Sequence, residues 1–298
     1  MLDDLSLHEL ENLLTDASYI SEPPISMALY LSLKLNKPLL VEGPAGVGKT
    51  EIAKVLSRVL ETDLVRLQCY DGIEASQALY EWNYQYQLMY LKMQEIKGIK
   101  DSDNLETELY DQRFLLRRPI LSSILAEKTV VLLIDEIDRA DEAFESFLLE
   151  VLSDWQVSVP EIGTLIAKTR PVVVLTSNAA RELSEALRRR CMFLYIDYPS
   201  FAKEVAIVTA KIPGLHKRLV QQICKFMEAL REKRLRKLPG VAETLDWARA
   251  LAALHIEDLD REMVASTLGL VLKDWKDQRE IQLSLSQLLE KTGVQSKI

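Results

Sequence analysis

The segment GPAGVGKT, residues 43–50, has the residue types and spacing of a phosphate-binding loop, G-x-x-x-x-G-K-[ST]. Glycine permits backbone angles that turn N–H groups inward around phosphate oxygens, and the start of a following helix adds a partial positive charge. We expect Lys49 to reach the β- and γ-phosphates of a nucleotide and the Thr50 hydroxyl to bind Mg²⁺. The residues expected to contact the nucleotide are Gly43, Pro44, Ala45, Gly46, Val47, Gly48, Lys49 and Thr50.

A glycine turn that happens to precede Lys-Thr is the alternative interpretation of these eight residues. The flanking sequence disfavours it, because KPLLVEG at 37–43 predicts a buried strand and TEIAKVLSRVL at 50–60 predicts a helix. A strand, a glycine loop and a helix in this order are the context that the motif requires.

Two adjacent carboxylates, Asp135 and Glu136, end the apolar run TVVLLIDE at 129–136. Parallel sheets bind ligands at the carboxyl ends of their strands, so Asp135 is expected to join the nucleotide site as a ligand of Mg²⁺. Glu136 is the expected general base or water-positioning residue for attack on the γ-phosphate. Alternatively, both acids cap the following helix. Nucleotide kinases built on the same loop do not typically show this acid pair, so the sequence favours hydrolysis over phosphoryl transfer to a small molecule.

Asn178 follows another apolar run, RPVVVLTSN at 170–178. We expect this strand to lie beside the strand that ends in Asp135. The Asn178 side chain would then donate to the γ-phosphate or orient the attacking water together with Glu136. Taken alone, an asparagine after a strand is more often a turn residue, but its position between the acid pair and a group of arginines favours the site.

Three consecutive arginines, Arg188 to Arg190, stand out in a chain with 37 basic and 45 acidic residues. On a helix, successive side chains point about 100° apart, so the three cannot all reach one target. Some can complement the dipole at the helix end or stay solvated. One can be an arginine finger that enters the phosphate site of a neighbouring subunit, which requires the chain to form a ring.

The elements that must position these residues alternate between strands and helices up to about residue 199. Further strands are predicted at 63–70 and 192–199, a hairpin at 156–167, and a polar, helical stretch between 82 and 113 with a loop near 98–104. After Pro199 the pattern has only helical periodicity. The predicted fold class is α/β: a P-loop αβα domain with a parallel sheet at 1–199, followed by a small all-helical domain at 200–298.

Composition limits the possible partners and compartment. The formal net charge of −8 argues against a surface that holds nucleic acid or an anionic membrane without sequence preference, because such surfaces are basic. Cys69, Cys191 and Cys224 are odd in number and match no zinc spacing, so we expect buried structural thiols. The sequence has neither a signal peptide at its start nor an apolar run of membrane-spanning length, and we expect a cytoplasmic protein.

Nearly the whole chain resembles the AAA+ ATPases. In this resemblance Asn178 corresponds to sensor 1 and the helical region to the lid domain. Within them it is similar to the MoxR group, and closest to its CoxD- and CbbQ-like ATPases. The stretches that carry this resemblance are VEGPAGVGKT, LYEWNYQ, LLIDEIDRADEAFE, LTSN, RELSEALRRRC and PGVAETLDWARAL.

The resemblance implies a hexameric ring that hydrolyses ATP between subunits, with Mg²⁺ as cofactor. Such a ring remodels, matures or activates a client protein or metalloenzyme, typically with a separate partner that carries a von Willebrand factor A domain. The stretch at about 80–113 would be the helix 2 insert, and 156–167 the pre-sensor-1 hairpin; both are thought to face the pore or client. Arg190 aligns best with the arginine finger, and Arg188 is the second choice.

The chain departs from the family pattern in its helical region. Many AAA+ proteins have a sensor 2 arginine where this chain has Ala242, Glu243 and Thr244, and Arg249 follows more than a turn later. This departure leaves open a nucleotide-gated binding module that barely hydrolyses ATP. The chief alternative is a DNA-acting AAA+ ATPase, clamp-loader-like or a translocase subunit, and the acidic net charge disfavours it.

Overall fold

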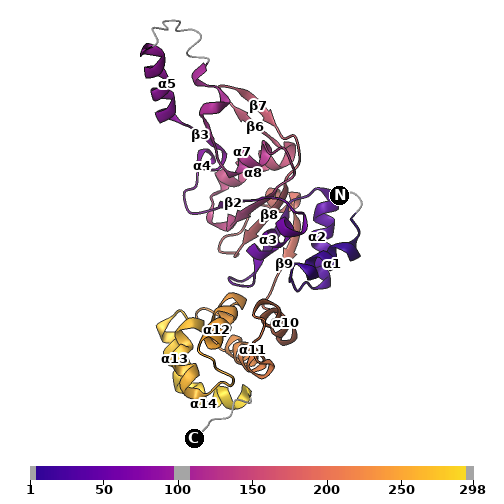
Figure 1. Cartoon of the computed structure of the whole chain (residues 1–298), viewed down its shortest axis with the longest axis vertical. Helices are drawn as coiled ribbons and strands as arrows, with labels where there is room; N and C mark the ends of the chain where they lie inside the picture. The colour runs from indigo at the N-terminus through magenta and orange to yellow at the C-terminus, as the bar shows by residue number, and fades with distance from the viewer. Residues whose placement is uncertain (1–4, 97–107, 293–298) are drawn as a thin grey trace. The chain divides into compact units, whose positions relative to one another are not determined.

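The computed structural model describes residues 5–96 and 108–292 (Figure 1). The loop predicted near 98–104 lies outside these residues. The described chain divides into two compact units. One contains 23–42 and 50–194 with the described part of 1–7, and the other contains 8–22, 43–49 and the described residues from 195 onward. The domains expected at 1–199 and 200–298 stay a prediction.

A five-stranded sheet forms the centre of the first unit, in the order β2-β5-β8-β1-β9. The pairs β2–β5, β5–β8 and β1–β8 are parallel. The register places Gln68 opposite Asp135 and Glu42 opposite Ser177, so the polar ends of the strands meet at one edge. The strands are β1 Leu39–Glu42, β2 Leu64–Gln68, β5 Val131–Asp135, β8 Val172–Ser177 and β9 Met192–Tyr195.

The apolar runs form these strands because helices cover the sheet. Every residue of β5 is buried, and the sheet residues share one hydrophobic core with side chains of the covering helices. Helix α7 packs on β2 and β5, and α2 packs on β1. The helices of this unit are α2 Pro23–Leu35, α3 Lys49–Val59, α4 Ala75–Leu79, α7 Pro119–Ile124, α8 Glu142–Asp154 and α9 Glu185–Arg190, with 3-10 turns at Gln112–Phe114 and Ile137–Arg139.

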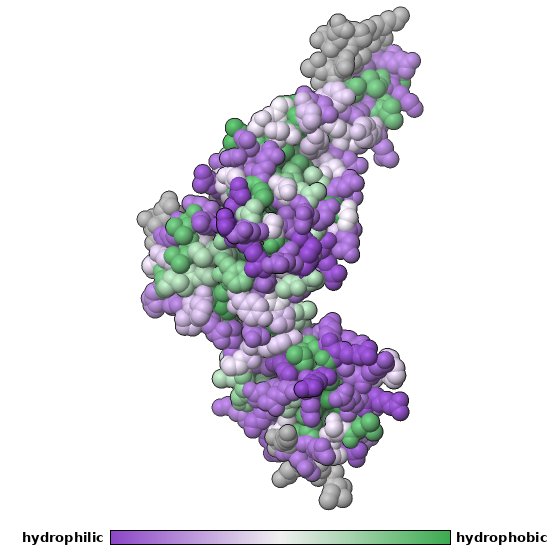
Figure 2. Space-filling model, turned by 180° about the vertical axis from the view of Figure 1, so that it is seen from behind, coloured by the Kyte–Doolittle hydropathy of each residue, from purple (hydrophilic) through white to green (hydrophobic). Residues whose placement is uncertain are grey.

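The stretch between 80 and 117 contains helix α5, Tyr84–Ile96, as its polar, helical pattern predicts. It also contains two antiparallel strands that the sequence did not predict, β3 Tyr80–Trp82 and β4 Leu115–Arg117. Each strand is three residues long, too short for its periodicity to be seen. The surface around α5, near the top of Figure 2, shows apolar patches. Exposed apolar side chains of α5 are Tyr84, Tyr86, Leu88, Met89, Met93 and Ile96.

The hairpin predicted at 156–167 is present. Strands β6, Gln156–Val159, and β7, Gly163–Ile166, pair in antiparallel register with Val159 opposite Gly163. Val157 and Val159 of β6 are buried in the same hydrophobic core as the sheet, whereas most of β7 is exposed. The hairpin is therefore anchored through one strand and presents the other to solvent.

The second unit is built from helices with their own hydrophobic core. Within the described residues no strand follows β9, which agrees with the predicted switch to helical periodicity. Among residues 5–96 and 108–292, the helices lack the combination of length and hydropathy that a membrane span requires. The helices are α1 Leu7–Asp16, α10 Phe201–Lys211, α11 Lys217–Arg231, α12 Val241–Ala253, α13 Arg261–Val271 and α14 Trp275–Thr292.

A buried ion pair joins three of these helices. Glu204 of α10 is fully buried, and Arg231 of α11 donates to its two carboxylate oxygens at 2.7 Å each. Thr244 of α12 donates to the same carboxylate at 2.6 Å, and Arg231 Nε donates to the Pro239 carbonyl at 2.8 Å. The pair therefore satisfies its own charges and fixes the backbone that leads into α12.

The start of α12 rests on the glycine loop, which belongs to the same unit. A side-chain carbon on Gly240 would lie 2.7 Å from the backbone of Gly46, so only glycine fits there. The Ala242 amide donates to the Gly46 carbonyl at 3.2 Å, and the Glu243 carboxylate accepts from the Gly240 amide at 2.9 Å. Backbone contacts thus connect the loop to this helix.

Arg231→Met is expected to destabilise the helical unit, because it leaves the Glu204 carboxylate buried without its cation. Removing one partner of a buried ion pair costs about 3–5 kcal/mol. Native-state hydrogen exchange of the α10, α11 and α12 amides measures this loss. The control is Arg249→Met, since Arg249 and its partner Asp246 are both exposed and such pairs contribute under ~1 kcal/mol. Wild-type protection of these amides in Arg231→Met would contradict the account.

Gly240→Ala is expected to lower the thermal midpoint of the helical unit, because the added carbon pushes α12 away from the backbone of Gly46. Gly269→Ala in α13 is the matched control. A side-chain carbon there meets the Gln278 amide nitrogen at an ordinary 3.7 Å. Alanine also favours a helix over glycine by about 1 kcal/mol, so this control should leave the midpoint unchanged or raise it. Equal effects of the two substitutions would rule out the close contact.

Candidate functional site

The glycine loop between β1 and α3 is closed by the side chain of Lys49. Its Nζ donates to the carbonyls of Gly43 and Pro44 at 2.7 Å each. Gly43, Gly46 and Gly48 all have positive φ, which turns the backbone around the loop that also contains Pro44, Ala45 and Val47. A side-chain carbon on Gly43 would lie 1.9 Å from the Ile196 carbonyl oxygen, so the first position requires glycine.

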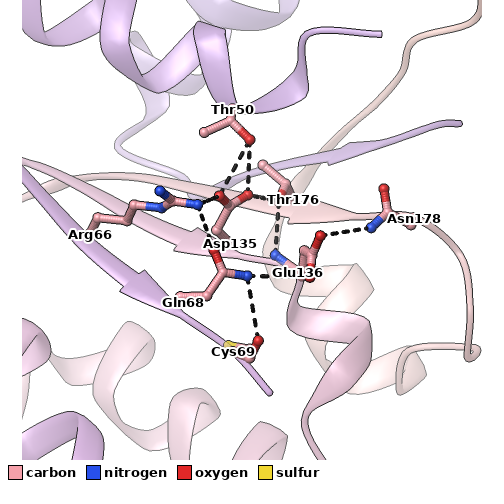
Figure 3. Close-up of polar contacts among 8 residues, drawn as sticks. All are labelled: Thr50, Arg66, Gln68, Cys69, Asp135, Glu136, Thr176 and Asn178. Carbon is pink, nitrogen blue, oxygen red and sulfur yellow. Dashed lines mark hydrogen bonds and ion pairs between the residues drawn. The ribbon is translucent and has the colours of Figure 1, made fainter. Parts of the chain in front are cut away.

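Asp135 is a buried carboxylate on which three elements converge (Figure 3). Thr50, the residue after Lys49, donates from Oγ1 to Oδ1 of Asp135 at 3.0 Å. Thr176 of β8 donates to the same oxygen at 2.5 Å, and Arg66 of β2 donates to Oδ2 at 2.6 Å. A threonine hydroxyl and a carboxylate that contact each other provide oxygen ligands, the kind of ligand that Mg²⁺ binds. Thr50 and Asp135 therefore fit the magnesium site that the sequence predicted.

Glu136 is held beside Asp135 by polar groups of both neighbouring strands (Figure 3). Its backbone is left-handed, with φ 56° and ψ 50°, and its amide donates to the Thr176 hydroxyl at 2.9 Å. The side-chain amide of Asn178 donates to one carboxylate oxygen at 3.4 Å, and that of Gln68 donates to the other at 3.3 Å. The structure thus brings together Asp135, Glu136 and Asn178.

The alternative that the two acids cap the following helix does not describe this geometry. Glu136 precedes the short 3-10 turn 137–139, but its side chain makes no capping hydrogen bond there. Asp138, inside that turn, accepts instead from the amides of Asn178 and Ala180 at 3.2 and 2.9 Å. Asp138 therefore fixes the loop that carries Asn178 toward Glu136.

Sequence reasoning missed Arg66, Gln68 and Thr176. Arg66 and Gln68 lie on the same face of β2, because side chains two residues apart in a strand point the same way. Two polar residues at alternate positions of a strand next to the one that ends in Asp135 are a signal that could have indicated contact with the acid pair. Thr176 lies two residues before Asn178 in the strand, where a threonine is also an ordinary strand residue without a functional signal.

The three arginines of α9 turn toward different partners of their own chain. Arg188 donates to Glu42 of β1 at 2.8 Å and lies over the ring of Phe193. Arg189 is exposed and pairs with Glu185 one turn earlier. Arg190 is exposed, and its Nε donates to the Ser153 hydroxyl at 2.8 Å. This divergence is what helical geometry requires.

A buried acid positions the segment that leads into α9. Glu145 of α8 pairs with the Arg181 guanidinium and accepts from the Ser184 amide at 2.8 Å. Ser184 then caps the helix by accepting from the Leu187 amide. The start of the arginine helix is thus fixed by contacts of its own unit.

Arg249 of the helical region forms an exposed ion pair with Asp246, three residues earlier in α12. At the positions where many AAA+ proteins have an arginine, Glu243 caps the start of α12 and Thr244 bonds the buried Glu204. These three residues therefore each have a partner within the helical region itself.

The cysteines are buried, as expected for structural thiols. Burial, with a smaller contribution from the nearby carboxylates of Asp135, Asp138 and Glu136, raises the pKa of Cys69 to about 12. Burial also raises the pKa of Cys191 to about 12 and raises that of Cys224. All three thiols are protonated at neutral pH, so none has the thiolate that a nucleophile needs.

Comparison with known proteins agrees with this architecture. Two curated relatives are uncharacterized staphylococcal proteins. One, from Staphylococcus aureus, is 26% identical over 229 residues, 74% of this chain and 77% of its own length. The other, from Staphylococcus epidermidis, is 25% identical over 265 residues, 86% of this chain and 90% of its own length. Among solved structures, a RuvB mutant of Thermotoga maritima covers 99% of this chain and 85% of its own, with a TM-score of 0.50 and 17% identity.

At 17% identity the likeness to RuvB concerns the fold alone, and that fold is the predicted one: a P-loop AAA+ sheet with a C-terminal helical region. Residues 38–191, just over half of the chain, match the family described as AAA domain (dynein-related subfamily). The matched range contains the glycine loop, the acid pair, Asn178 and the three arginines. The chain therefore belongs to the AAA domain family, in its dynein-related subfamily.

Proposed function

We propose that this protein is an ATPase that binds Mg²⁺ and ATP at residues 43–50 and Asp135. The proposal is supported by the loop that Lys49 closes and by the contact between the Thr50 hydroxyl and the Asp135 carboxylate. The loop amides and Lys49 bind the phosphates, whereas Thr50 and Asp135 hold the metal ion. When bound, Mg²⁺ neutralises charge on the β- and γ-phosphates.

The way in which the carboxylate of Glu136 is held supports hydrolysis over binding alone. Its two oxygens accept from the amides of Gln68 and Asn178, so the carboxylate is oriented and available to take a proton from water. Asn178 orients the same water. This pair of amides around Glu136 is the observation that carries the proposal, because a binding module has no need to orient a base.

The catalytic arginine is proposed to come from a neighbouring subunit of a ring, expected to be a hexamer. Arg190 is the first candidate, because its side chain is exposed. The partners of its guanidinium are a serine hydroxyl and a backbone carbonyl, which are uncharged and hold it less strongly than a carboxylate would. Arg188 is the second, although it already pairs with Glu42. An exposed arginine can reach the phosphates of the adjoining subunit and stabilise the charge that develops during hydrolysis.

We propose further that the ring is a MoxR-type chaperone that remodels or activates a client protein or metalloenzyme, with a separate von Willebrand factor A domain protein as partner. The exposed apolar side chains of α5 and the outer strand of the hairpin offer surfaces for such a client. Methionines suit an adaptable protein surface, and α5 exposes two, Met89 and Met93. The net charge of −8 supports a protein client over nucleic acid.

Glu136→Gln is expected to lower the ATP turnover number at least ~100-fold, because an amide cannot take the proton from water. Its affinity for a fluorescent ATP analogue should stay within about threefold of wild type, since Glu136 is not placed on the phosphates or the metal. Glu142→Gln, an exposed acid in the first turn of α8, is the control with the same charge change. Wild-type turnover in Glu136→Gln would refute the role of this carboxylate.

Arg190→Ala is expected to abolish turnover while leaving nucleotide binding intact. If the arginine acts in the neighbouring subunit, mixing Arg190→Ala with Glu136→Gln restores activity at sites that receive one intact residue from each chain. Random mixing at equal amounts should restore up to about a quarter of wild-type turnover. Arg189→Ala, which removes an exposed arginine paired with Glu185, is the control. Full activity of Arg190→Ala alone would exclude it as the finger.

The class of target is tested by capture and by stimulation. Glu136→Gln should retain ATP and keep its client bound, so a pull-down from native cells is expected to recover a protein partner in an ATP-dependent manner. ATP turnover that is stimulated by DNA and lost with rising salt would instead assign the DNA-acting alternative.

A further inference from the structure

Asp135, the carboxylate proposed to hold Mg²⁺, already has a cation bound to it. Arg66 Nη2 lies 2.6 Å from Asp135 Oδ2, at the distance of a charge-assisted hydrogen bond. The Asp135 side chain is 5% exposed, whereas that of Arg66 is 51% exposed. The guanidinium therefore reaches from solvent onto a buried charge.

The two carboxylate oxygens of Asp135 have different hydrogen-bond donors. Oδ1 accepts from the hydroxyls of Thr50 and Thr176, and Oδ2 accepts from Arg66. Thr50 Oγ1, a proposed ligand of Mg²⁺, also lies 3.3 Å from Oδ2. The carboxylate oxygen that pairs with Arg66 is therefore next to this ligand. Arg66 thus stands at the side of the carboxylate where the metal would bind.

A guanidinium and a divalent cation repel each other strongly at such short separations, the more so beside a buried group. They cannot both stay on the same carboxylate at low cost. Arg66 is able to leave, since its side chain is long and half exposed and its second contact is a hydrogen bond to the Gln68 side chain. Mg²⁺ has no comparable alternative, because Asp135 and Thr50 are the ligands proposed for it.

We propose that Arg66 is the resident counter-cation of Asp135, which Mg²⁺ must displace when the nucleotide binds, and that it thereby sets the magnesium concentration at which the protein binds its nucleotide. Arg66 is a positioning residue: it holds the carboxylate oriented and charge-compensated before the metal arrives. The inference rests on the proposed magnesium–nucleotide site at Asp135.

The test is the binding of a fluorescent ADP analogue, measured from excess EDTA through a series of Mg²⁺ concentrations. Arg66→Gln removes the competing charge and keeps a polar side chain with a hydrogen-bond donor. The Mg²⁺ concentration that gives half of the gain in affinity is expected to fall about fivefold relative to wild type, as for loss of a partly exposed ion pair. Arg66→Lys, which keeps the charge, should stay within about twofold of wild type.

Arg58→Gln is the matched control. Arg58 is also half exposed and pairs with a carboxylate, that of Glu51, but both residues lie in α3. Replacing Arg58 with glutamine changes the net charge by the same amount as replacing Arg66. It should leave the Mg²⁺ midpoint unchanged. Arg66→Met, neutral and unbranched, provides the same test if Arg66→Gln does not fold.

An unchanged midpoint in Arg66→Gln would overturn the inference. A raised midpoint would also overturn it, because it would mean that Arg66 assists the bound magnesium nucleotide, for example through a phosphate. An equal fall in Arg66→Lys and Arg66→Gln would show that the charge is not the cause. If the wild-type protein binds no nucleotide at any Mg²⁺ concentration, the proposed function itself fails, which is a separate result.

Discussion

The buried negative charge of Asp135 is the constraint on which the site depends. A carboxylate at the end of a covered strand is costly unless hydrogen bonds and a cation compensate it. Here the hydroxyls of Thr50 and Thr176 and the guanidinium of Arg66 do so. They come from α3, β8 and β2, so the order β2-β5-β8 is what allows them to meet. The same order places Gln68 and Asn178 on either side of Glu136. The strand order therefore has two results: the charge of Asp135 is compensated, and the carboxylate of Glu136 is oriented.

The helical unit uses the same principle at a second place. Glu204 is fully buried, and Arg231 and Thr244 satisfy it. Arg231 also bonds the Pro239 carbonyl, one residue before the glycine that rests on Gly46. Because both Gly43 and Gly240 are in contact with backbone that leaves no room for a side chain, the shape of the loop is fixed by main-chain contacts. Glu243, where many AAA+ proteins have an arginine, acts here as the cap of α12.

Contiguous signals could be predicted from the sequence, and contacts distant in sequence could not. The loop at 43–50, the strand ending in Asp135 and the hairpin at 156–167 are each encoded by a short run of residues. Arg66 and Thr176 contact Asp135 from 69 and 41 positions away, so their roles emerge only once the strand order is known. The strands β3 and β4 are too short to have a period. The partner of Arg188, Glu42, is 146 positions away and adjoins the loop, which no local pattern could reveal.

The proposed nucleotide site is one that a second copy of the chain completes. Its most direct test is ATP turnover per protomer measured over a series of protein concentrations, with the assembly state followed by sedimentation velocity under the same conditions. We predict that turnover per protomer follows the assembled fraction and falls toward zero when the protein is diluted to monomers. Turnover that stays constant per protomer where only monomers sediment would contradict the account.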